Sequence, residues 1–265
     1  MPAMSRFEQL PVALQAALAE RRLLKVIAGL TNFDSAAVER ISRAAGQGGA
    51  DLVDVACDPA LVKLAARASG LPICVSAVDP ELFPAAVAAG ATMVEIGNYD
   101  AFYPQGRIFD AAEVLELTRR SRALLAGVVL SVTVPHVLPL DQQEQLAVEL
   151  VAAGADIIQT EGGTSARPFS AGSLGLIEKA APTLAAAHAI SRALAASPSQ
   201  ANPFQTPVLC ASGLSAVTVP LAIAAGASGV GVGSAVNRLS DPLAMVAAVR
   251  SLRDALGRAL APCLI

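Results

Sequence analysis

Aromatic and charged residues are both scarce in this sequence of 265 residues. Tryptophan is absent, there are two tyrosines and seven phenylalanines, and only 15% of the residues are charged. Since 54% of the residues are hydrophobic, the composition excludes a disordered chain and is sufficient for one large core. The apolar residues are mainly Ala, Val, Leu and Ile, which is typical of parallel strands buried on both faces beneath small-residue helices.

Lysine is also rare, and the net charge is −3. The three lysines are Lys25, Lys63 and Lys179. A nucleic-acid surface needs clustered Lys and Arg, so we expect no nucleic-acid partner. No apolar run reaches the roughly 18 residues that span a bilayer, and the N-terminus lacks the apolar region of a signal peptide. These absences predict a cytoplasmic protein with no membrane partner.

The four cysteines show no metal-binding or redox pattern. Cys57, Cys74, Cys210 and Cys263 have no Cys-x-x-Cys spacing, which disfavours a zinc site and a redox motif. We expect these cysteines to be small buried hydrophobic residues of a protein in a reducing compartment. The sequence likewise predicts no metal site. An ion held by Asp54, Glu95 and Glu161 is the weaker alternative.

Four segments align without gaps and define an internal repeat. Each begins with the glycine that follows an Ala-rich helical run and then enters a short strand, at 49–56, 90–97, 154–161 and 226–233. Four more strand candidates lie at 24–29, 72–76, 128–133 and 207–211. Helical runs follow the strands at 34–46, 59–69, 80–89, 111–124, 140–153, 182–196, 216–225 and 241–256.

This alternation of strands and helices predicts an α/β protein with a single (β/α)8 TIM barrel. Eight strand–helix pairs in about 240 residues are the arithmetic of that fold. We expect one domain over residues 1–265, with an N-terminal cap helix at about 7–20 and the barrel at about 24–256. The polar stretch 197–205 is expected to be an inert linker on the lower face.

The period of two along each repeated strand assigns side chains to the two faces of the barrel. The β-branched positions should point outward, so Asp54, Glu95 and Gln159 should share one inward layer with Gly231. Lys25, in the first strand, is the expected partner of the two carboxylates. Two interpretations remain open: a buried ion network that only fills the barrel, and a catalytic acid–base set or an amine that forms a Schiff base.

Active sites of this fold lie at the carboxyl ends of the strands. His136 and Glu161 follow the fifth and sixth strands there and are candidate acid–base groups. Asn32, Asn98 and Gln159 are candidate substrate contacts. Tyr99 and Tyr103 share the loop 98–110, which either stacks on a planar ligand as a lid or is a long loop pinned by its own aromatics. A second long loop is expected at 162–182, where Arg167 would close on an anion.

The glycine-rich ends of strands seven and eight predict a phosphate site. Glycine lets backbone N–H groups approach an anion, and loops seven and eight of TIM barrels commonly bind phosphate. The expected phosphate-binding residues are Ser212, Gly213, Gly233, Ser234 and Ala235.

Several strings resemble one family of cyanobacteria and algal plastids, the hypothetical chloroplast reading frame twenty-three family. The strings lie at 25–33, 72–76, 94–98, 158–162 and 211–213. The resemblance extends from Lys25 to Val236. It implies a barrel fold in the cytoplasm or plastid stroma and no established activity.

Two segments carry further, more distant resemblances. Residues 211–213 and 229–235 are similar to phosphate sites in synthases and isomerases of phosphorylated metabolites, and also in flavin-binding nitronate monooxygenases. In the latter these loops would hold the phosphate of FMN, and residues 159–163 resemble a ligand-contacting loop.

Three hypotheses about function follow from the residues and the resemblances. The first is an acid–base enzyme (a lyase, isomerase or synthase) that acts on a small phosphorylated metabolite. In it Lys25, Asp54, Glu95 and Glu161 act below the bound phosphate and His136 acts at the rim. The second is an FMN-dependent oxidoreductase, and the third is a non-catalytic metabolite sensor or protein-interaction barrel. The oligomeric state is left open.

Overall fold

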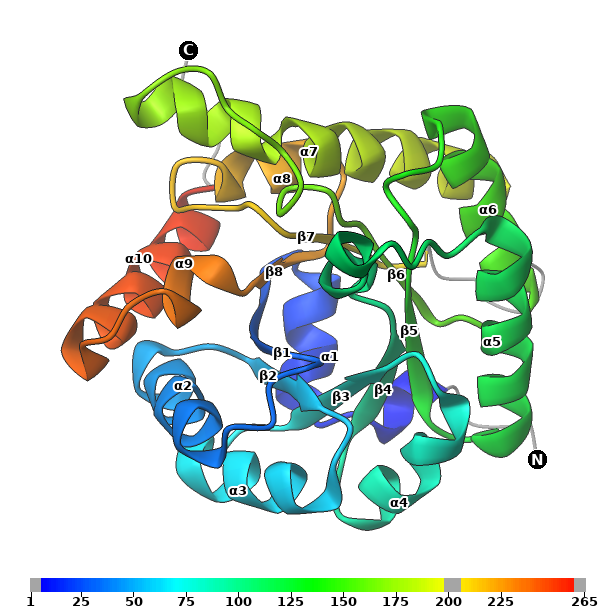
Figure 1. Cartoon of the computed structure of the whole chain (residues 1–265), viewed down its shortest axis with the longest axis horizontal. Coiled ribbons are helices and arrows are strands. Elements are labelled where there is room, and N and C mark those ends of the chain that lie inside the picture. Colours follow the sequence, from blue (N-terminus) through cyan, green and yellow to red (C-terminus); the bar gives the residue numbers. More distant parts are fainter. Residues whose placement is uncertain (1–5, 198–205, 260–265) are drawn as a thin grey trace.

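The computed structural model describes residues 6–197 and 206–259, and its centre is a closed barrel of eight parallel strands in the order β1 to β8 (Figure 1). Every neighbouring pair is parallel, including β1 with β8. The expected TIM barrel is therefore confirmed. The strands are β1 (Leu23–Gly29), β2 (Leu52–Ala56), β3 (Ile73–Ala77), β4 (Met93–Ile96), β5 (Val129–Thr133), β6 (Ile157–Gln159), β7 (Val208–Ala211) and β8 (Gly229–Val232).

Helices surround this barrel, as Figure 1 shows. The α-helices are α1 (Val12–Ala19), α2 (Ser35–Gly48), α3 (Pro59–Ser69), α4 (Phe83–Ala88), α5 (Ala111–Leu124), α6 (Leu140–Ala152), α7 (Gly172–Ala196), α8 (Val219–Ala224), α9 (Ser234–Asn237) and α10 (Pro242–Ala259). Short 3₁₀-helices lie at Arg6–Gln9, Pro80–Leu82, Tyr99–Ala101 and Tyr103–Gln105. Apart from α1, α7 and α9, these bounds agree with the predicted helical runs to within about three residues. The predicted cap helix at about 7–20 is divided into a 3₁₀-helix and α1, and no predicted run corresponds to α9.

The repeated glycines end helices as the sequence predicts. Gly49, Gly90, Gly154 and Gly226 have φ values of 85°, 112°, 108° and 114°, a region that L side chains rarely adopt. Each glycine turns the chain from a helix into the next even-numbered strand. The repeat is therefore a repeated helix-to-strand turn.

The predicted register of the even strands is also confirmed. Leu52, Met93 and Ile157 pack inside the lower end of the barrel. The alternate residues Val53, Val94 and Ile158 belong to the larger core, which lies between the barrel and the outer helices. The inward layer above Leu52 consequently receives Asp54, Glu95 and Gln159.

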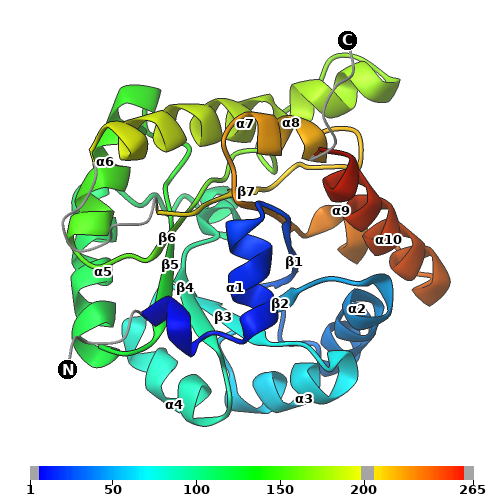
Figure 2. The ribbon, with the colours of Figure 1, turned by 180° about the vertical axis from the view of Figure 1, so that it is seen from behind.

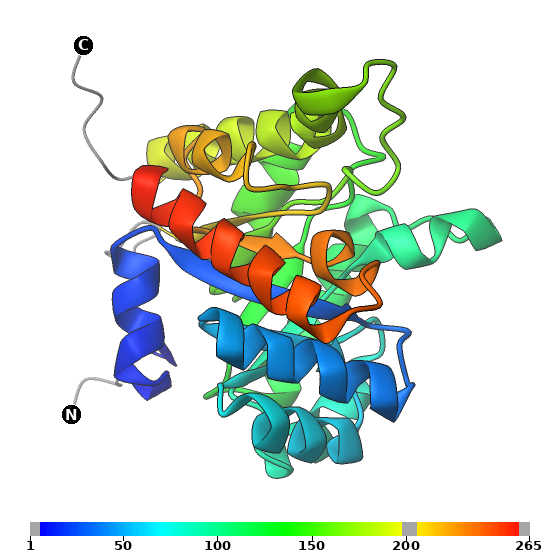
Figure 3. The same ribbon diagram turned by 90° about the vertical axis from the view of Figure 1, so that its left-hand side faces the viewer.

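The cap helix closes the amino-terminal end of the barrel. Helix α1 crosses this end in Figure 2, and its Leu14 and Leu18 pack on the lower inward layer. In Figure 3, α1 lies at one end of the barrel, and the 3₁₀-helices at Tyr99–Gln105 project from the opposite end. The lower end is thus sealed by apolar side chains, so a ligand must enter from the upper face.

Helix α7 corrects one prediction. The sequence favours a loop over 162–182 and a helix over 182–196, but the helix begins at Gly172 and contains Pro182. The Glu178 side chain accepts hydrogen bonds from the backbone N–H groups of Phe169 and Ser170, which fastens the preceding loop to the helix. A proline inside a helix removes one hydrogen bond and crowds the carbonyl four residues before it. Helix α7 nevertheless continues through Pro182, where Ala180, Thr183 and Ala186 are buried against the fold.

Three smaller observations complete the fold. Cys57, Cys74 and Cys210 are buried free thiols, as expected, and Cys263 lies outside the described residues. The predicted linker lies almost entirely within 198–205, also outside the described part. Within residues 6–197 and 206–259, no helix is both long and apolar enough to cross a membrane.

Candidate functional site

The middle layer of the barrel holds a buried ion network. Lys25 Nζ lies 2.5 Å from Glu95 Oε2 and 3.4 Å from Asp54 Oδ2, and all three side chains are at most 1% exposed. Serine hydroxyls complete it: Ser76 donates to Asp54 at 2.7 Å and Ser131 donates to Glu95 at 2.9 Å. The structure therefore brings together the lysine and both carboxylates that the sequence predicts.

The charges in this layer shift one another's protonation. Burial lowers the pKa of Lys25, but the charges of Glu95 and Asp54 outweigh it and hold the pKa well above its usual range. Lys25 therefore stays an ammonium ion and lacks the lone pair that a Schiff base requires. This direction disfavours the Schiff-base alternative.

Asp54 shifts in the opposite sense to an ordinary ion-paired carboxyl. Burial raises its pKa, Lys25 lowers it and Glu95 raises it again, and the result is about 7. Two buried carboxylates share one ammonium ion, so one of them retains a proton up to near neutrality.

The proton that Asp54 retains predicts that the free energy of unfolding depends on pH. Between about pH 4 and 7 the folded chain keeps a proton on Asp54 that the unfolded chain has lost. Unfolding then releases a proton, so this group makes stability fall as pH rises. Asp54→Asn should remove that slope and leave a balanced Lys25–Glu95 pair. Chemical denaturation at pH 5 and pH 8 checks it, with Asp254→Asn on the exposed face of α10 as the control. If the free energy of unfolding changes equally with pH in the wild type and in Asp54→Asn, Asp54 does not retain a proton in the folded chain.

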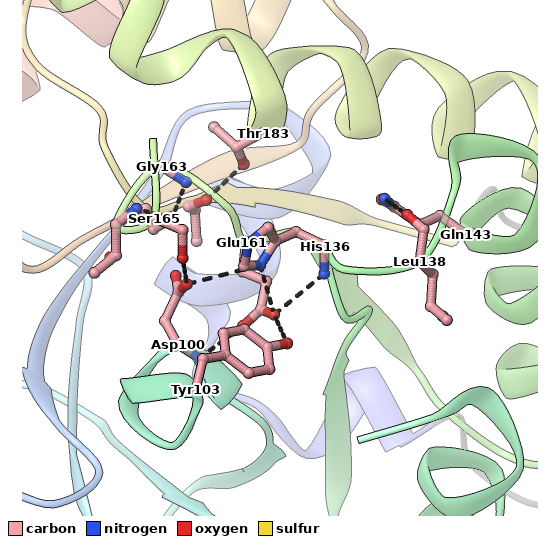
Figure 4. A network of polar contacts seen from close by, with 12 residues as sticks. Asp100, Tyr103, His136, Leu138, Gln143, Glu161, Gly163, Ser165 and Thr183 are labelled. Carbon is pink, nitrogen blue, oxygen red and sulfur yellow. Dashed lines mark hydrogen bonds and ion pairs between the residues drawn. The ribbon is translucent and has the colours of Figure 1, made fainter. Parts of the chain in front are cut away.

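A second polar cluster, the rim group, lies above this layer and consists of Asp100, Tyr103, His136 and Glu161 (Figure 4). Glu161 Oε1 accepts a hydrogen bond from the Tyr103 hydroxyl at 2.5 Å and lies 3.2 Å from both the backbone nitrogen and Nδ1 of His136. Asp100 Oδ1 lies 3.7 Å from the same ring nitrogen. The geometry favours a proton on Nδ1 that is donated to Glu161, which leaves Nε2 as a base.

Burial and charge perturb both titratable partners of this pair. Burial lowers the pKa of His136, but its hydrogen bond to Glu161 and the charges of Glu161 and Asp100 outweigh burial and raise it. Burial raises the pKa of Glu161, while the hydrogen bonds from His136 and Tyr103 lower it in part. Perturbed groups of this kind gather at functional sites.

A cavity of about 220 Å³ lies at the carboxyl ends of the strands. Its lining includes the predicted residues Asn98, Ser212, Gly213, Gly233 and Ser234. Asp100 of the rim group and Asn237 also line it. Larger hollows of about 350 and 240 Å³ lie on the outer helices, away from the strand ends. The upper cavity is the candidate site because it joins the glycine-rich loops to the rim group.

The cavity wall contains backbone in unusual conformations. Among the described residues, Arg21, Asn98 and Ser212 are the non-glycine residues with positive φ, and two of them line the cavity. Ser212 Oγ accepts a hydrogen bond from the Gly163 N–H at 2.7 Å. A Cβ on Gly163 would lie 2.4 Å from the Ser212 carbonyl oxygen, so only glycine allows this contact between the loops. Such backbone is often held for function.

Two of the predicted lid residues are elsewhere. Tyr99 is fully buried and stacks on Phe109 at 4.6 Å between ring centroids, so it does not stack on a ligand. The loop 98–110 is therefore pinned by its own aromatics. Arg167 is exposed and donates to the carbonyl groups of Thr164 and Ser165, outside the cavity lining.

Two other predicted contacts border the cavity without lining it. Asn32 donates to the Ala28 carbonyl, and Ala235 is half-buried beside Ser234. Both remain within one or two residues of lining positions.

The clusters also bear on metal binding. Three potential ligands come together in Asp54, Cys74 and Glu95, and three more in Asp100, His136 and Glu161. The alternative set of Asp54, Glu95 and Glu161 is thus divided between two clusters. Lys25 already supplies a cation to the lower cluster. The upper cluster has the donor types that Zn²⁺ or Mn²⁺ accepts.

Sequence reasoning did not single out Asp100 and Asn237 as site residues, although both follow strands on the upper face. Asp100 lies two residues after Asn98, which has a positive φ of 63°. Asn237 ends α9, and its amide donates to the Ile27 carbonyl at 2.7 Å. A signal was available in the polar residues that cluster after the strands, but only the fold shows which of them face the cavity.

These features define a TIM-barrel protein with a polar cavity at the carboxyl ends of its strands. The family described as "Protein of unknown function (DUF561)" matches residues 10–261. The chain is 42% identical to "Uncharacterized protein ycf23" of Cyanophora paradoxa over 77% of this chain and 80% of that protein. It is 35% identical to the protein of the same name from Pyropia yezoensis, over 89% of this chain and 83% of that protein. The chain therefore belongs to the ycf23 family.

Solved structures support the fold. Thiamine phosphate pyrophosphorylase from Pyrococcus furiosus has a TM-score of 0.56 and 17% identity, over 92% of this chain and all of that chain. The (S)-3-O-geranylgeranylglyceryl phosphate synthase from Thermoplasma acidophilum, in complex with sn-glycerol-1-phosphate, has a TM-score of 0.55 and 13% identity, over 94% and 99%. At these identities the similarity shows a shared barrel.

Proposed function

We propose that this protein is an acid–base enzyme of the lyase, isomerase or synthase type that acts on a small phosphate-bearing metabolite. The phosphate binds at the loops after β7 and β8, where Ser212, Gly213, Gly233, Ser234 and Ala235 lie. Proton transfer falls to the rim group. A cytoplasmic or stromal location belongs to the same proposal.

One observation carries this proposal: the upper cavity joins a glycine-rich wall to Asp100, the rim-group carboxylate that lies beside His136. Gly213 and Gly233 line the cavity on the side of β7 and β8. Asp100 lines it too, and its carboxylate lies 3.7 Å from His136 Nδ1. Backbone N–H groups beside glycine suit a phosphate, and a carboxylate–imidazole pair suits proton transfer. Two of the solved barrels with this fold carry phosphate compounds in their names, which agrees with the proposal.

The buried layer supports the chemistry from below. Asn98 lines the cavity, and its amide donates to Glu95 Oε1 at 3.3 Å. Gln159 donates to the same oxygen at 2.7 Å. Lys25, Asp54 and Glu95 are closed to solvent, so in this proposal they fix the positions and the field of Asn98 and Gln159.

Calorimetric titration tests the proposal directly. Inorganic phosphate, a panel of sugar phosphates and FMN are titrated into the purified chain, and bound ligands are then followed for turnover. Binding of a phosphate compound, followed by its conversion, is the expected result. A yellow protein that binds FMN would move the oxidoreductase hypothesis to first place. Binding of none of them would contradict the phosphate site and favour an interaction barrel.

Gly233→Val should abolish binding of the phosphate ligand while the barrel remains folded. Gly233 has a negative φ of −114° with ψ −78°, and a Cβ there would meet no atom closer than 3.4 Å, so there is space for a side chain. The valine methyl groups would then enter the cavity where the anion should bind. Titration of the variant measures the loss of binding. A free energy of unfolding within about 1 kcal/mol of the wild-type value shows that the fold is intact.

The matched control for this substitution is Gly127→Val, on an exposed loop beside the Gln9 side chain. It should bind as the wild type does. Unchanged binding in Gly233→Val would place the anion elsewhere.

A further inference from the structure

The amide side chains at the upper cavity present acceptor oxygens rather than donors. Three amide side chains lie at or beneath the cavity: Asn98, Gln159 and Asn237. Each uses its NH₂ group inside the protein. Asn98 and Gln159 donate to Glu95 Oε1 at 3.3 and 2.7 Å, and Asn237 donates to the Ile27 carbonyl at 2.7 Å.

These contacts fix the orientation of each amide. A flipped Gln159 would place its carbonyl oxygen against the Glu95 carboxylate. A flipped Asn237 would place its oxygen against the carbonyls of Ile27 and Ala28, to which the amide now donates. Both alternatives bring two acceptors together without a proton between them, so the network excludes them.

Two of the amide oxygens have no donor. Within the described part of the chain, Gln159 Oε1 and Asn237 Oδ1 are buried atoms with no hydrogen-bond partner. Gln159 is itself fully buried. An unpaired buried acceptor costs free energy that a ligand donor can recover.

The two oxygens lie on the same side of the barrel, around Ile27. A Cβ on Gly231 would lie 3.0 Å from Ile27 Cδ1 and 3.4 Å from Gln159 Oε1. The Asn237 amide holds the Ile27 carbonyl, and both Ile27 and Asn237 line the cavity. Both oxygens are closed to solvent, so a ligand packed against Ile27 reaches Asn237 Oδ1 and Gln159 Oε1 only once the side chains around Ile27 move.

Asp100 adds a carboxylate to the same cavity. Hydroxyl groups satisfy such acceptors, whereas a second anion is repelled and an apolar group leaves them unpaired. From these acceptors we infer that the end of the ligand remote from its phosphate carries hydroxyl groups, so that the substrate class is a phosphorylated polyol or sugar. The inference rests on the proposed function, since it assumes that the phosphate occupies the glycine-rich wall.

Three small phosphate monoesters that carry different groups beyond the phosphate separate the possibilities. They are sn-glycerol 1-phosphate with hydroxyls, propyl phosphate with an apolar chain and 2-phosphoglycolate with a carboxylate. In calorimetric titration of the wild type, sn-glycerol 1-phosphate should bind at least about 10-fold more tightly than propyl phosphate, which is the effect of one or two hydrogen bonds. Phosphoglycolate should bind most weakly.

Asn237→Ala tests the acceptor itself. This variant should lose most of the preference for sn-glycerol 1-phosphate over propyl phosphate, measured as the ratio of the two affinities within the variant, so that a loss common to both ligands cancels. Propyl phosphate thus serves as the internal control for the fold and the phosphate wall.

The outcomes distinguish this inference from the proposed function. Equal binding of sn-glycerol 1-phosphate and propyl phosphate by the wild type would overturn the hydroxyl inference and leave the phosphate site standing. An unchanged preference in Asn237→Ala would also overturn it, at the residue that carries it. Binding of none of the three, and of no inorganic phosphate, would overturn the proposed function.

Discussion

Lys25→Met is expected to lower the free energy of unfolding by about 3–5 kcal/mol, the usual cost of removing one partner of a buried ion pair. The ammonium group lies 2.5 Å from Glu95 and 3.4 Å from Asp54 and is closed to solvent. Its removal leaves two neighbouring carboxylates in the barrel with only hydroxyl and amide donors. For a chain of this size the melting temperature should fall by roughly 6–20 °C.

Two further variants make this expectation specific to charge. Lys63→Met, on the exposed face of α3, should leave the melting temperature nearly unchanged. The triple variant Lys25→Met, Asp54→Asn, Glu95→Gln should recover much of the lost stability, because neutral isosteres carry no unpaired charge. A Lys25→Met protein with the melting temperature of the wild type would mean that water reaches the layer of Asp54 and Glu95.

The sequence predicts the barrel well because its strands carry two independent signals. The glycines that end the helices repeat in an ungapped alignment, and the alternate β-branched positions assign the faces. Together these signals predict that Asp54, Glu95 and Gln159 share one layer. Lys25 followed as the cation that such a layer needs.

Helix α7 shows where local signals mislead. Gly172, Gly175 and Pro182 all read as loop residues. In the fold, a Cβ on Gly175 would lie 2.1 Å from the Ser170 carbonyl oxygen, so this glycine allows the preceding loop to approach the helix closely. Glu178 ties the loop to the helix. Both contacts join the helix to Ser170 in the preceding loop. They form only because the loop folds back onto the helix, which the sequence pattern does not show.

The sequence predicts the site residues that lie just after strands, but it does not predict how the residues within loops are oriented. His136 and Glu161 follow directly from strands β5 and β6, and the structure brings them into contact. Tyr99, expected to meet a ligand, instead fills the interior of its own loop. Asp100, two residues after the left-handed residue Asn98, lines the cavity. A sequence pattern gives strand direction, but it does not give the direction of a loop side chain.

His136→Gln is expected to lower the turnover of the phosphorylated substrate by about 10²–10⁴-fold, the usual contribution of a general acid or base. Binding of the phosphate ligand should change little, because His136 does not line the phosphate wall. Glu161→Gln should lower the rate as well, since Glu161 orients the imidazole ring through Nδ1. His188→Gln, at the exposed second histidine on α7, should keep the wild-type rate.

A titration of the histidine signals by NMR tests this pair without a substrate. The sequence has two histidines, and His188→Gln assigns the signal of His136. The hydrogen bond and charge of Glu161 raise the pKa of His136 against the opposing effect of burial. Glu161→Gln should therefore lower that pKa, and it should move the acidic limb of the rate profile to lower pH if His136 acts as the base. A His136 signal that titrates identically in wild type and Glu161→Gln would show that the pair does not form in solution, and Asp100 would then be the remaining candidate base at the cavity.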